Sequence, residues 1–493
     1  MAKSKTAVVT SLILFMTLLS LGGSIIGVLA SPASPIISME QPLYTRFNKE
    51  AYFRGVGFTT GNYYIWMQRP DQNSTRYTGT SFQPAADGSI PSETKISINV
   101  DYPFGTYKIS VSQSPSSDTS LTQCHFGLWG TDKSVYQRTE SVLILGGGTW
   151  PGSSVKLIVR NPLGTFVFNS TIASSVNGTF SAKWRIPNNA VTGSDDVFID
   201  GMGTFDDPKR DYFHKTGFTV TSAALQISVY TKPQTTSQRT ETSAMDFQVK
   251  YPDASPVVTI GGEKAPVSLT NGPILVAQIF PKLTDATNGV WRASWEIPVN
   301  ATLGSEYRYE LNPEDFDDGF KNIGVSDKIV SDLFTVAPAT LRIEIETNKT
   351  AYQVMFDSIN IRSSVTYPSG AIMSNGKVTL RVTHGKLNQT IPMTYNNSTG
   401  FWHATRSLTF LELAQIGTWT LSMEANDGLG NIGVTSTEVS VQPWLAVLAF
   451  ACLIVGLFFF IRGLQWLRRK HWKKLSNSLK NFRFPFRKPQ TEY

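Results

Sequence analysis

The stretch VNGTFSAKW at residues 176–184 returns 111 residues later as TNGVWRASW at residues 287–295. The match continues without a gap through an Ile-Pro pair and an Asn-Ala pair to a Phe-Asp-Asp triplet, at 205–207 and 316–318. Asn-Gly supplies the positive φ angles of a tight hairpin turn, and the alternating residues that follow fit a half-buried strand. So long a match without a gap indicates a duplicated β domain.

A looser form of this pattern extends over residues 36–442. A turn glycine is followed, fifteen to seventeen residues later, by a second glycine that precedes a period-2 strand, as at Thr106–Val111 and Thr418–Met423. The pairs are Gly88 with Gly105, Gly178 with Gly193, Gly289 with Gly304, and Gly400 with Gly417. Earlier in each copy a strand ends at a proline turn. Short, regularly spaced strands with such turn signals predict β-sandwiches.

The predicted fold is all-β: a tandem array of four Ig-like β-sandwich domains with an N-terminal signal or anchor helix and a C-terminal transmembrane helix. Trp184 and Trp295 are expected to fill sandwich cores. The predicted boundaries are 1–31 for a signal peptide or uncleaved anchor, 32–130, 131–223, 224–339 and 340–442 for the four domains, 443–463 for the transmembrane helix, and 464–493 for a basic cytoplasmic tail.

These motifs carry a family resemblance. The proline turn, the Asn/Asp-Gly hairpin, the Trp-x-Ile-Pro segment and the Gly-Thr-Tyr-x-Ile-x-Val strand resemble prokaryotic extracellular Ig-like or macroglobulin-like domains. Arrays of such domains occur in bacterial and archaeal membrane-anchored surface proteins, so the resemblance implies an archaeal-type surface protein. It covers residues 36–442 and is weakest in the first domain, which lacks Trp-x-Ile-Pro and alone carries Cys124-His125. The resemblance implies an architecture and not a function.

The C-terminal part predicts a membrane anchor. Trp444–Ile461 is free of charge, and the tail from Arg462 carries ten Lys or Arg and one acid. An apolar span followed by a basic run predicts a transmembrane helix whose tail is cytoplasmic. Apolar residues recur in the tail at helical spacing. They predict either a basic amphipathic helix on the anionic inner leaflet or a plain stop-transfer tail. The membrane-surface candidates are Arg468, Arg469, Lys470, Lys473 and Lys474.

The N-terminus predicts export of residues 32–443. Lys3 and Lys5 precede an uncharged run from Thr6 to Ala30, and small residues before Ser31 suit signal-peptide cleavage. The run is also long enough for an uncleaved anchor. Cleavage would give a single-pass protein and retention a two-pass protein; both place the ectodomain outside the cell membrane and the C-terminus in the cytoplasm.

The charge distribution argues against nucleic acid as a partner. Of the net charge of +7, the tail contributes +9 and the N-terminal lysines +2, which leaves −4 for the ectodomain. A nucleic-acid interface needs a basic folded face. The expected partners are anionic lipids of the inner leaflet and other surface or integral membrane proteins. Cys124 is the lone ectodomain cysteine, so the domains must be stable without an internal disulfide.

Acidic loops are the candidates for a metal site. Asp206, Asp207, Asp317 and Asp318 occupy matching positions in the duplicated domains. Carboxylate-rich loops can bind calcium, although no cofactor is required by the sequence and the spacing fits no EF-hand. The alternative is turn formation, in which Asp side chains accept backbone hydrogen bonds.

No catalytic signature is present in the sequence, and we expect no enzyme. The histidines are scattered without metal-ligand spacing, and Cys124 and His125 would point to opposite faces of a strand without an evident orienting partner. Gly146-Gly147-Gly148 is interpreted as a β-bulge instead of a phosphate loop. Eight sequons predict possible N-glycosylation, at Asn73, Asn169, Asn177, Asn300, Asn348, Asn388, Asn396 and Asn397.

Two function classes follow. The first is a membrane-anchored structural or interaction protein that presents a rod of Ig-like domains, as a surface-layer companion, an adhesin or a spacer. The alternative is an accessory ectodomain of a membrane complex such as a transporter, secretion or sensory assembly. Only Gln442 and Pro443 separate the last predicted strand from the span, so the last domain should stand directly on the bilayer.

Overall fold

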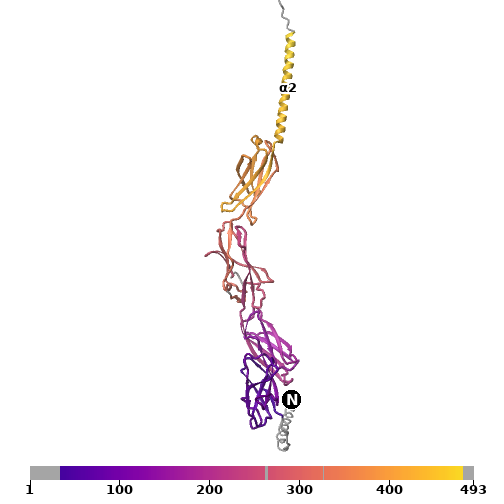
Figure 1. The fold of residues 1–493 in the computed structure, drawn as a ribbon, viewed down its shortest axis with the longest axis vertical. Helices are drawn as coiled ribbons and strands as arrows, with labels where there is room; N and C mark the ends of the chain where they lie inside the picture. The colour runs from indigo at the N-terminus through magenta and orange to yellow at the C-terminus, as the bar shows by residue number, and fades with distance from the viewer. Residues whose placement is uncertain (1–33, 261–264, 326, 481–493) are drawn as a thin grey trace, which may run out of the picture. The chain divides into compact units, whose positions relative to one another are not determined.

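The computed structural model describes residues 34–480 except 261–264 and 326, with side chains to Lys473. The predicted N-terminal signal or anchor helix and the end of the tail lie outside the described residues. Contacts divide the chain into two compact units. The first contains the described residues up to Gln226, with 249–260 and 316–325; the second contains 227–248, 265–315 and 327–480. Strands dominate both units, and α2 (Trp444–Lys480) is the long helix in Figure 1. The predicted all-β class is confirmed.

The predicted first domain lies in the first unit and has two sheets. One has the order β1-β3-β6, and the other contains β5, β4, β7 and β8 in that order. Between them lies a core that includes Phe53, Ile65, Tyr107 and Phe126. The strands are β1 (Ile36–Met39), β2 (Leu43–Thr45), β3 (Glu50–Val56), β4 (Tyr63–Gln68), β5 (Arg76–Phe82), β6 (Lys95–Ser97), β7 (Gly105–Ser112) and β8 (Thr122–Thr131).

The predicted second domain shares a sheet with the first. Strand β8 also pairs with β10, and β10 pairs with β13, while the opposite sheet has the order β12-β11-β14-β15-β9. Leu43 and Trp129 belong to the second core, so the predicted boundary at 130/131 falls on a strand that serves both cores. The strands are β9 (Val135–Gln137), β10 (Ser141–Gly146), β11 (Ser154–Arg160), β12 (Phe166–Ala173), β13 (Phe180–Arg185), β14 (Gly193–Met202) and β15 (Asp211–Thr221).

Most of the predicted third domain lies in the second unit. There β22 lies between β18 and β21, and a second sheet has the order β17-β26-β23-β19-β20. The start of β16 (Ala224–Thr231) pairs with β24 (Ile323–Gly324) in the first unit. The remaining elements are β17 (Thr236–Gln238), β18 (Thr242–Lys250), β19 (Val267–Asn271), β20 (Ile274–Ile279), β21 (Lys282–Asp285), β22 (Val290–Glu296), β23 (Gly304–Leu311), η1 (Pro313–Asp315), β25 (Ile329–Val330) and β26 (Phe334–Ala337).

The predicted fourth domain has the strand order of an immunoglobulin sandwich. Its sheets have the orders β27-β29-β33-β32 and β28-β35-β34-β30-β31, which correspond to ABED and to GFC with an added strand at each edge. Trp402 and Trp419 are buried in its core. The elements are β27 (Arg342–Thr347), β28 (Ala351–Gln353), β29 (Ser358–Thr366), β30 (Lys377–His384), β31 (Leu387–Pro392), β32 (Thr394–Asn396), β33 (Phe401–Ser407), η2 (Phe410–Ala414), β34 (Gly417–Asn426) and β35 (Ile432–Gln442).

One pairing recurs in all four predicted domains. A three-residue strand near the start of each domain pairs in parallel with its last strand: β2 with β8, β9 with β15, β17 with β26, and β28 with β35. The predicted hairpin glycines Gly178 and Gly289 both have φ of 66°. Trp295 is buried as predicted, and Trp184 packs half-buried against its core.

The Gly146–Gly148 triplet is a close-packing site, and the pairing of β10 with β13 shows no register shift up to Gly146. A Cβ atom on Gly147 would lie 2.3 Å from the carbonyl carbon of Gly105, and one on Gly127 would lie 1.8 Å from the carbonyl oxygen of Gly147. Real Cβ atoms do not approach backbone atoms so closely. The glycines therefore let the backbones of the first two predicted domains touch.

Helix α2 is one continuous helix that extends beyond the predicted span of 443–463 into the predicted tail. Its stretch Trp444–Lys473 is long and apolar enough to cross a membrane, with a mean hydropathy of 2.8 over its most apolar window. The helix begins against the last predicted domain: Leu445 N donates to Gln353 Oε1 at 3.2 Å, and the Phe410 and Phe450 rings lie 5.8 Å apart. As predicted, no stalk separates strand β35 from the helix.

Candidate functional site

A short sequence, Gln-Arg-Thr-Glu, occurs at 137–140 and again at 238–241. In both copies the glutamate carboxylate accepts from the glutamine backbone N–H at 2.7 Å, and the threonine has φ near 70°. These contacts close a tight turn directly after the parallel strand β9 or β17. The turn holds the arginine side chain against the end of its domain, so both arginines are buried although charged.

In the first unit, Arg138 joins the second predicted domain to a loop of the third. Its Nε donates to Ala190 O at 2.7 Å within its own domain. Its Nη1 donates to Phe320 O and, at 3.2 Å, to Asn322 Oδ1. The buried guanidinium therefore binds carbonyl and amide oxygens from both sides of the junction.

Asn322 completes this junction. It is fully buried, and its Nδ2 donates to Asn188 O at 2.9 Å while its Oδ1 accepts from Ala223 N at 2.8 Å. Asp318 holds it in place, since Asp318 Oδ2 accepts from Asn322 Nδ2 and from the Tyr251 hydroxyl, each at 2.7 Å. Burial, opposed by the Asn188 hydrogen bond and supported by Asp318, raises the pKa of Tyr251 to about 12. The tyrosine stays protonated and donates.

In the second unit, Arg239 makes the equivalent contacts. Its Nε and Nη2 donate to Ala301 O, and its Nη1 donates to Leu429 O at 2.7 Å. Asn431 is also fully buried; its Nδ2 donates to Val299 O at 3.3 Å and its Oδ1 accepts from Ala339 N at 2.7 Å. A buried arginine, a buried asparagine and the backbone at the boundary with the next domain thus form the junction between the third and fourth predicted domains, as they do in the first unit.

In this second junction, Asp427 occupies the position that Asp318 has in the first and accepts the corresponding hydrogen bonds. Its Oδ2 accepts from Asn431 Nδ2 at 2.5 Å and from the Tyr367 hydroxyl at 3.2 Å. Burial would raise the pKa of Asp427, but the hydrogen bonds from Asn431, Leu429 N and Tyr367 outweigh it and hold that pKa below its usual range. The carboxylate is therefore charged at neutral pH, as its acceptor role requires.

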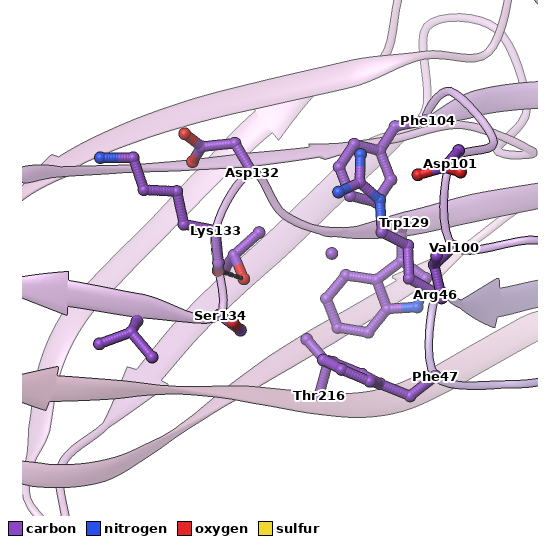
Figure 2. Close-up of a pocket in the computed structure, with 13 residues that line it drawn as sticks. Arg46, Phe47, Val100, Asp101, Phe104, Trp129, Asp132, Lys133, Ser134 and Thr216 are labelled. Atoms are coloured by element: carbon purple, nitrogen blue, oxygen red, sulfur yellow. Dashed lines mark hydrogen bonds between the residues drawn. The ribbon is translucent and has the colours of Figure 1, made fainter.

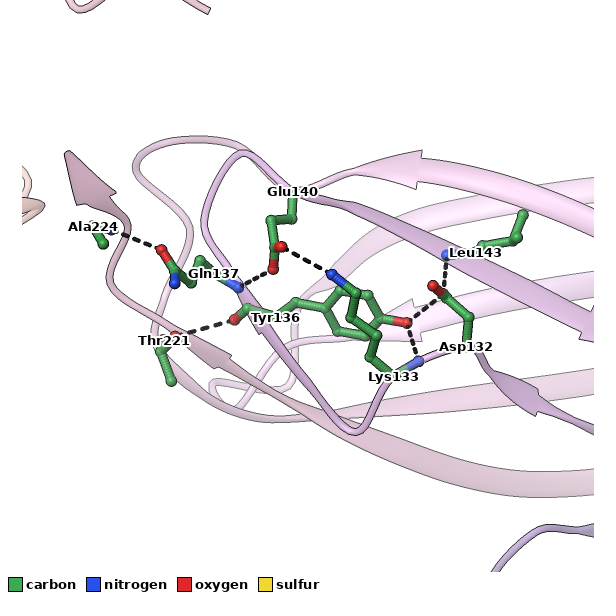
Figure 3. Close-up of polar contacts among 8 residues, drawn as sticks. All are labelled: Asp132, Lys133, Tyr136, Gln137, Glu140, Leu143, Thr221 and Ala224. Atoms are coloured by element: carbon green, nitrogen blue, oxygen red, sulfur yellow. Dashed lines mark hydrogen bonds and ion pairs between the residues drawn. The ribbon is translucent and has the colours of Figure 1, made fainter. Parts of the chain in front are cut away.

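The glutamine of the repeated turn fixes the start of the next domain. Figure 3 shows Gln137 Oε1 accepting from Ala224 N at 2.8 Å, and Thr221 Oγ1 donating to Tyr136 O. Gln238 Oε1 accepts from Thr340 N at 2.7 Å in the same way. In the fourth predicted domain the corresponding Gln353 accepts from Leu445 N, the second residue of α2.

Sequence reasoning missed these junctions, although signals for them were present. Gln-Arg-Thr-Glu is repeated, and Asp-Gly-x-x-Asn occurs at 318–322 and 427–431. The arginines face neutral oxygens of backbone carbonyls and of the Asn322 amide. Each arrangement can hold a loop of the following predicted domain against the end of the preceding one, because the buried polar atoms named above have geometrically defined partners.

Three of the predicted calcium ligands, Asp207, Asp317 and Asp318, act as turn acceptors, and Asp206 binds a residue of the first predicted domain. Asp206 accepts from the His125 backbone N–H and ring Nδ1, both at 2.6 Å, and Asp207 Oδ1 accepts from Lys209 N. Asp317 Oδ1 accepts from Gly319 N, and Asp318 contacts Asn322. Within the described residues, no group of three or more His, Cys, Asp or Glu side chains could hold a metal ion. Calcium binding stays a prediction, while turn formation has visible contacts.

Cys124 and His125 point to opposite faces of β8, as predicted. Cys124 is buried in the first core, and burial raises the pKa of its thiol far above the usual value. His125 does have an orienting partner, Asp206, and its ring lies 4.5 Å from that of Phe205. Asp206 comes from the loop after β14, so the pair joins the first two predicted domains and does not form a dyad with the thiol.

A cavity of about 450 Å³ lies in the first unit between residues of the first two predicted domains. Figure 2 shows Arg46, Phe47, Phe104, Trp129 and Thr216 around it. The Arg46 guanidinium lies 3.9 Å over the Phe104 ring. Within the described part of the chain, Arg46 Nε and Trp129 Nε1 are buried without a hydrogen-bond partner.

The predicted surface sites are accessible. All eight sequon asparagines are exposed. Of the basic candidates, Arg468, Arg469, Lys470 and Lys473 are exposed on α2, and Lys470 Nζ lies 4.8 Å from the Trp466 ring. The side chain of Lys474 lies outside the described residues. Exposure is compatible with glycosylation and with lipid contact, and both stay predictions.

No family model and no curated protein matches this sequence. Among solved structures, the chain is similar to a tetra-tandem repeat in the extending region of a large adhesion protein (13% identity, TM-score 0.23, covering 83% of this chain and 99% of that one). It is also similar to Escherichia coli alpha-2-macroglobulin (10% identity, TM-score 0.18, covering 83% of this chain and 42% of that one). A third similar structure is an I-band fragment of titin (10% identity, TM-score 0.21, covering 64% of this chain and 98% of that one). At these scores the likenesses carry no inference about this chain.

Proposed function

We propose that this chain is a non-enzymatic, membrane-anchored protein of the cell surface, in which four Ig-like domains act as a spacer, an adhesin or a surface-layer companion. The observation that carries the proposal is the repeated junction. Arg138 and Arg239 are buried at matching places, and each binds its own domain and the Asp-Gly-x-x-Asn loop of the next. Such a junction suits a protein whose role depends on a fixed order and spacing of its domains.

Two further features support the proposal. The parallel pairing that recurs four times supports four domains of one design. The apolar part of α2 supports a membrane anchor, and the basic residues after it favour a cytoplasmic C-terminus. Arg468, Arg469, Lys470, Lys473 and Lys474 would then lie at the anionic inner leaflet, at about 1 kcal/mol each.

Fractionation of cells that express the full chain tests the proposal. We expect the protein to stay in the membrane after alkaline carbonate extraction. External protease should digest the domains in intact cells and spare an epitope after Lys480. Release by carbonate would contradict the anchor, and protection of the domains would contradict the surface location.

Purification in mild detergent distinguishes the two function classes. We expect the protein to remain with the detergent-insoluble envelope or to be recovered alone. Recovery with stoichiometric integral-membrane subunits would instead support an accessory ectodomain of a transporter, secretion or sensory complex.

A further inference from the structure

Four exposed apolar side chains lie on two loops next to the start of α2. They are Met355, Phe356, Phe410 and Leu411, with exposed fractions of 45%, 54%, 55% and 80%. We propose that these four side chains, here named the collar, insert into the interface of the lipid bilayer that α2 crosses, so that the last domain is held by its loops as well as by its helix. The inference rests on the membrane anchor of the proposed function and adds a second lipid contact to it.

The collar is continuous with the helix. Met355 N donates to Leu408 O at 3.0 Å, which places the Met355–Phe356 turn beside the strand end that leads into η2, where Phe410 and Leu411 lie. Gln353 accepts from Leu445 N, and the Phe410 ring lies 5.8 Å from the Phe450 ring. Both collar loops therefore meet the first turns of α2.

The position of Phe410 beside α2 indicates how deeply the collar would enter the bilayer. Phe450 lies six residues after Trp444, so at ~1.5 Å per residue it lies about 9 Å along the axis from the helix start. Apolar faces of interfacial proteins enter the headgroup–acyl boundary by roughly 5–10 Å. A helix that enters the bilayer near the exposed Trp444 would carry Phe410 to that depth.

The corresponding end of the second and third predicted domains binds another domain. The hydrogen bond from Met355 N to Leu408 O has an equivalent in each of them, from Thr139 N to Ile186 O and from Thr240 N to Ile297 O. In those domains a buried arginine precedes the threonine and binds the next domain.

In the fourth domain, Val354 occupies the position of those arginines, and the exposed Met355 occupies the position of the buried Thr139 and the half-buried Thr240. The short turn that ends at Ala190 or Ala301, whose carbonyl oxygen accepts from the arginine, is replaced by η2 with Phe410 and Leu411. The polar docking surface has thus become apolar at the one domain end that is followed by an apolar helix.

The charges nearest the collar are already paired within the domain. Glu412 accepts from Arg406 at 3.0 Å, where both side chains are 10–12% exposed, and from the Thr409 hydroxyl. Asp357 pairs with Lys349 at 2.7 Å. Insertion of the collar would therefore bury apolar surface without placing these two carboxylates in lipid unpaired.

Site-directed fluorescence on the full chain tests the proposal. Cys124→Ala and Cys452→Ala remove the native thiols, and a small environment-sensitive fluorophore is attached at Leu411→Cys. Val176→Cys is the matched control, because Val176 is also an exposed aliphatic residue (84%) and lies in the first unit. Leu453→Cys reports the span itself. Each protein is reconstituted in phosphatidylcholine–phosphatidylglycerol vesicles and exposed to nitroxide-labelled phospholipid or to aqueous iodide. Unchanged melting temperatures of the labelled proteins establish that they are folded.

We expect the nitroxide lipid to quench the labels at 411 and 453 but not the label at 176, and iodide to quench only the label at 176. Quenching at 453 with iodide-accessible fluorescence at 411 would overturn the collar and leave the anchor intact. Absence of lipid quenching at 453 would overturn the proposed anchor and, with it, the collar. A label at 411 that neither quencher reaches would indicate a protein contact and would also overturn the proposal.

Discussion

Arg239 donates two hydrogen bonds to one acceptor, the carbonyl oxygen of Ala301, from Nε at 2.8 Å and from Nη2 at 2.5 Å. This leaves Nη1 to donate to Leu429 O across the junction. The guanidinium is planar and its donors are fixed relative to one another, so its position within one domain sets where the next domain's loop can bind.

Arg239→Ala should therefore destabilise the junction between the third and fourth predicted domains. Removal of the side chain takes the charged donor away from the carbonyl oxygens of Ala301 and Leu429, at a cost of about 2–4 kcal/mol. Urea unfolding of the detergent-solubilised chain, followed by protease susceptibility near Ala339, measures the loss. Arg239→Lys should not restore stability, because a lysine ammonium lacks the planar, fixed set of N–H donors of the guanidinium. Arg54→Ala, at a side chain that is 75% exposed, serves as the control and should change stability by less than about 0.5 kcal/mol.

Asn431→Asp should reverse the pH dependence of the same junction. The lowered pKa of Asp427 means that its contribution is present above the unfolded-state pKa of about 4 and is lost as pH falls through the lower folded-state value. A second carboxylate at 431 would lie against Asp427 and raise the pKa of one of the two, so the variant should be weakest at neutral pH and recover in acid.

Melting temperatures between pH 3 and pH 7, with Asn397→Asp as an exposed control, would reveal the change of slope. Parallel pH profiles for the wild type and Asn431→Asp would contradict the assigned role of Asp427.

Gly147→Ala should destabilise the first unit strongly. The added Cβ would meet the backbone of Gly105 and Thr106 at 2.3–2.4 Å, and backbone atoms cannot rotate away as a side chain can. Overpacking of this kind costs about 1–3 kcal/mol or more. Gly304→Ala is the matched control, because its Cβ would meet nothing closer than 3.7 Å. Equal urea midpoints for the two variants would show that the first two domains do not pack through the glycine triplet.

Calcium should leave the melting temperature of the full chain unchanged. Asp206, Asp207, Asp317 and Asp318 already accept hydrogen bonds from nearby donors, and calcium would have to replace several of them at once to gather six to eight oxygens. Calorimetry with millimolar calcium and with a chelator makes the measurement. A calcium-dependent increase that is lost in Asp317→Asn would establish the metal site that the sequence suggested.

The sequence predicted the fold through its turns and missed the junctions because they depend on long-range contacts. Asn-Gly at 177–178 and 288–289 specifies a hairpin locally, so period-2 strands on either side could be placed. Arg138 carries no local sign that it will be buried, since its acceptors lie 52 and more than 180 residues further along the chain. The close packing at Gly147 could not be predicted for the same reason, because the backbone that it touches belongs to Gly105, in another predicted domain.

Asp195 is a buried carboxyl whose replacement should stabilise the protein. It is 3% exposed, and its Oδ1 has no hydrogen-bond partner within the described residues. Burial, with a smaller contribution from Asp196, raises its pKa to about 6.

Because the folded-state pKa lies above the unfolded-state value, the protonated form favours folding below about pH 4, and this advantage is lost as pH rises through about 6. At pH 7 the charged carboxylate then costs about 1–3 kcal/mol. Asp195→Asn should raise the melting temperature at pH 7 and leave it unchanged at pH 4. Asp200→Asn, on the exposed face of the same strand, should do neither. A wild-type protein more stable than Asp195→Asn at pH 7 would mean that the carboxylate has a stabilising partner.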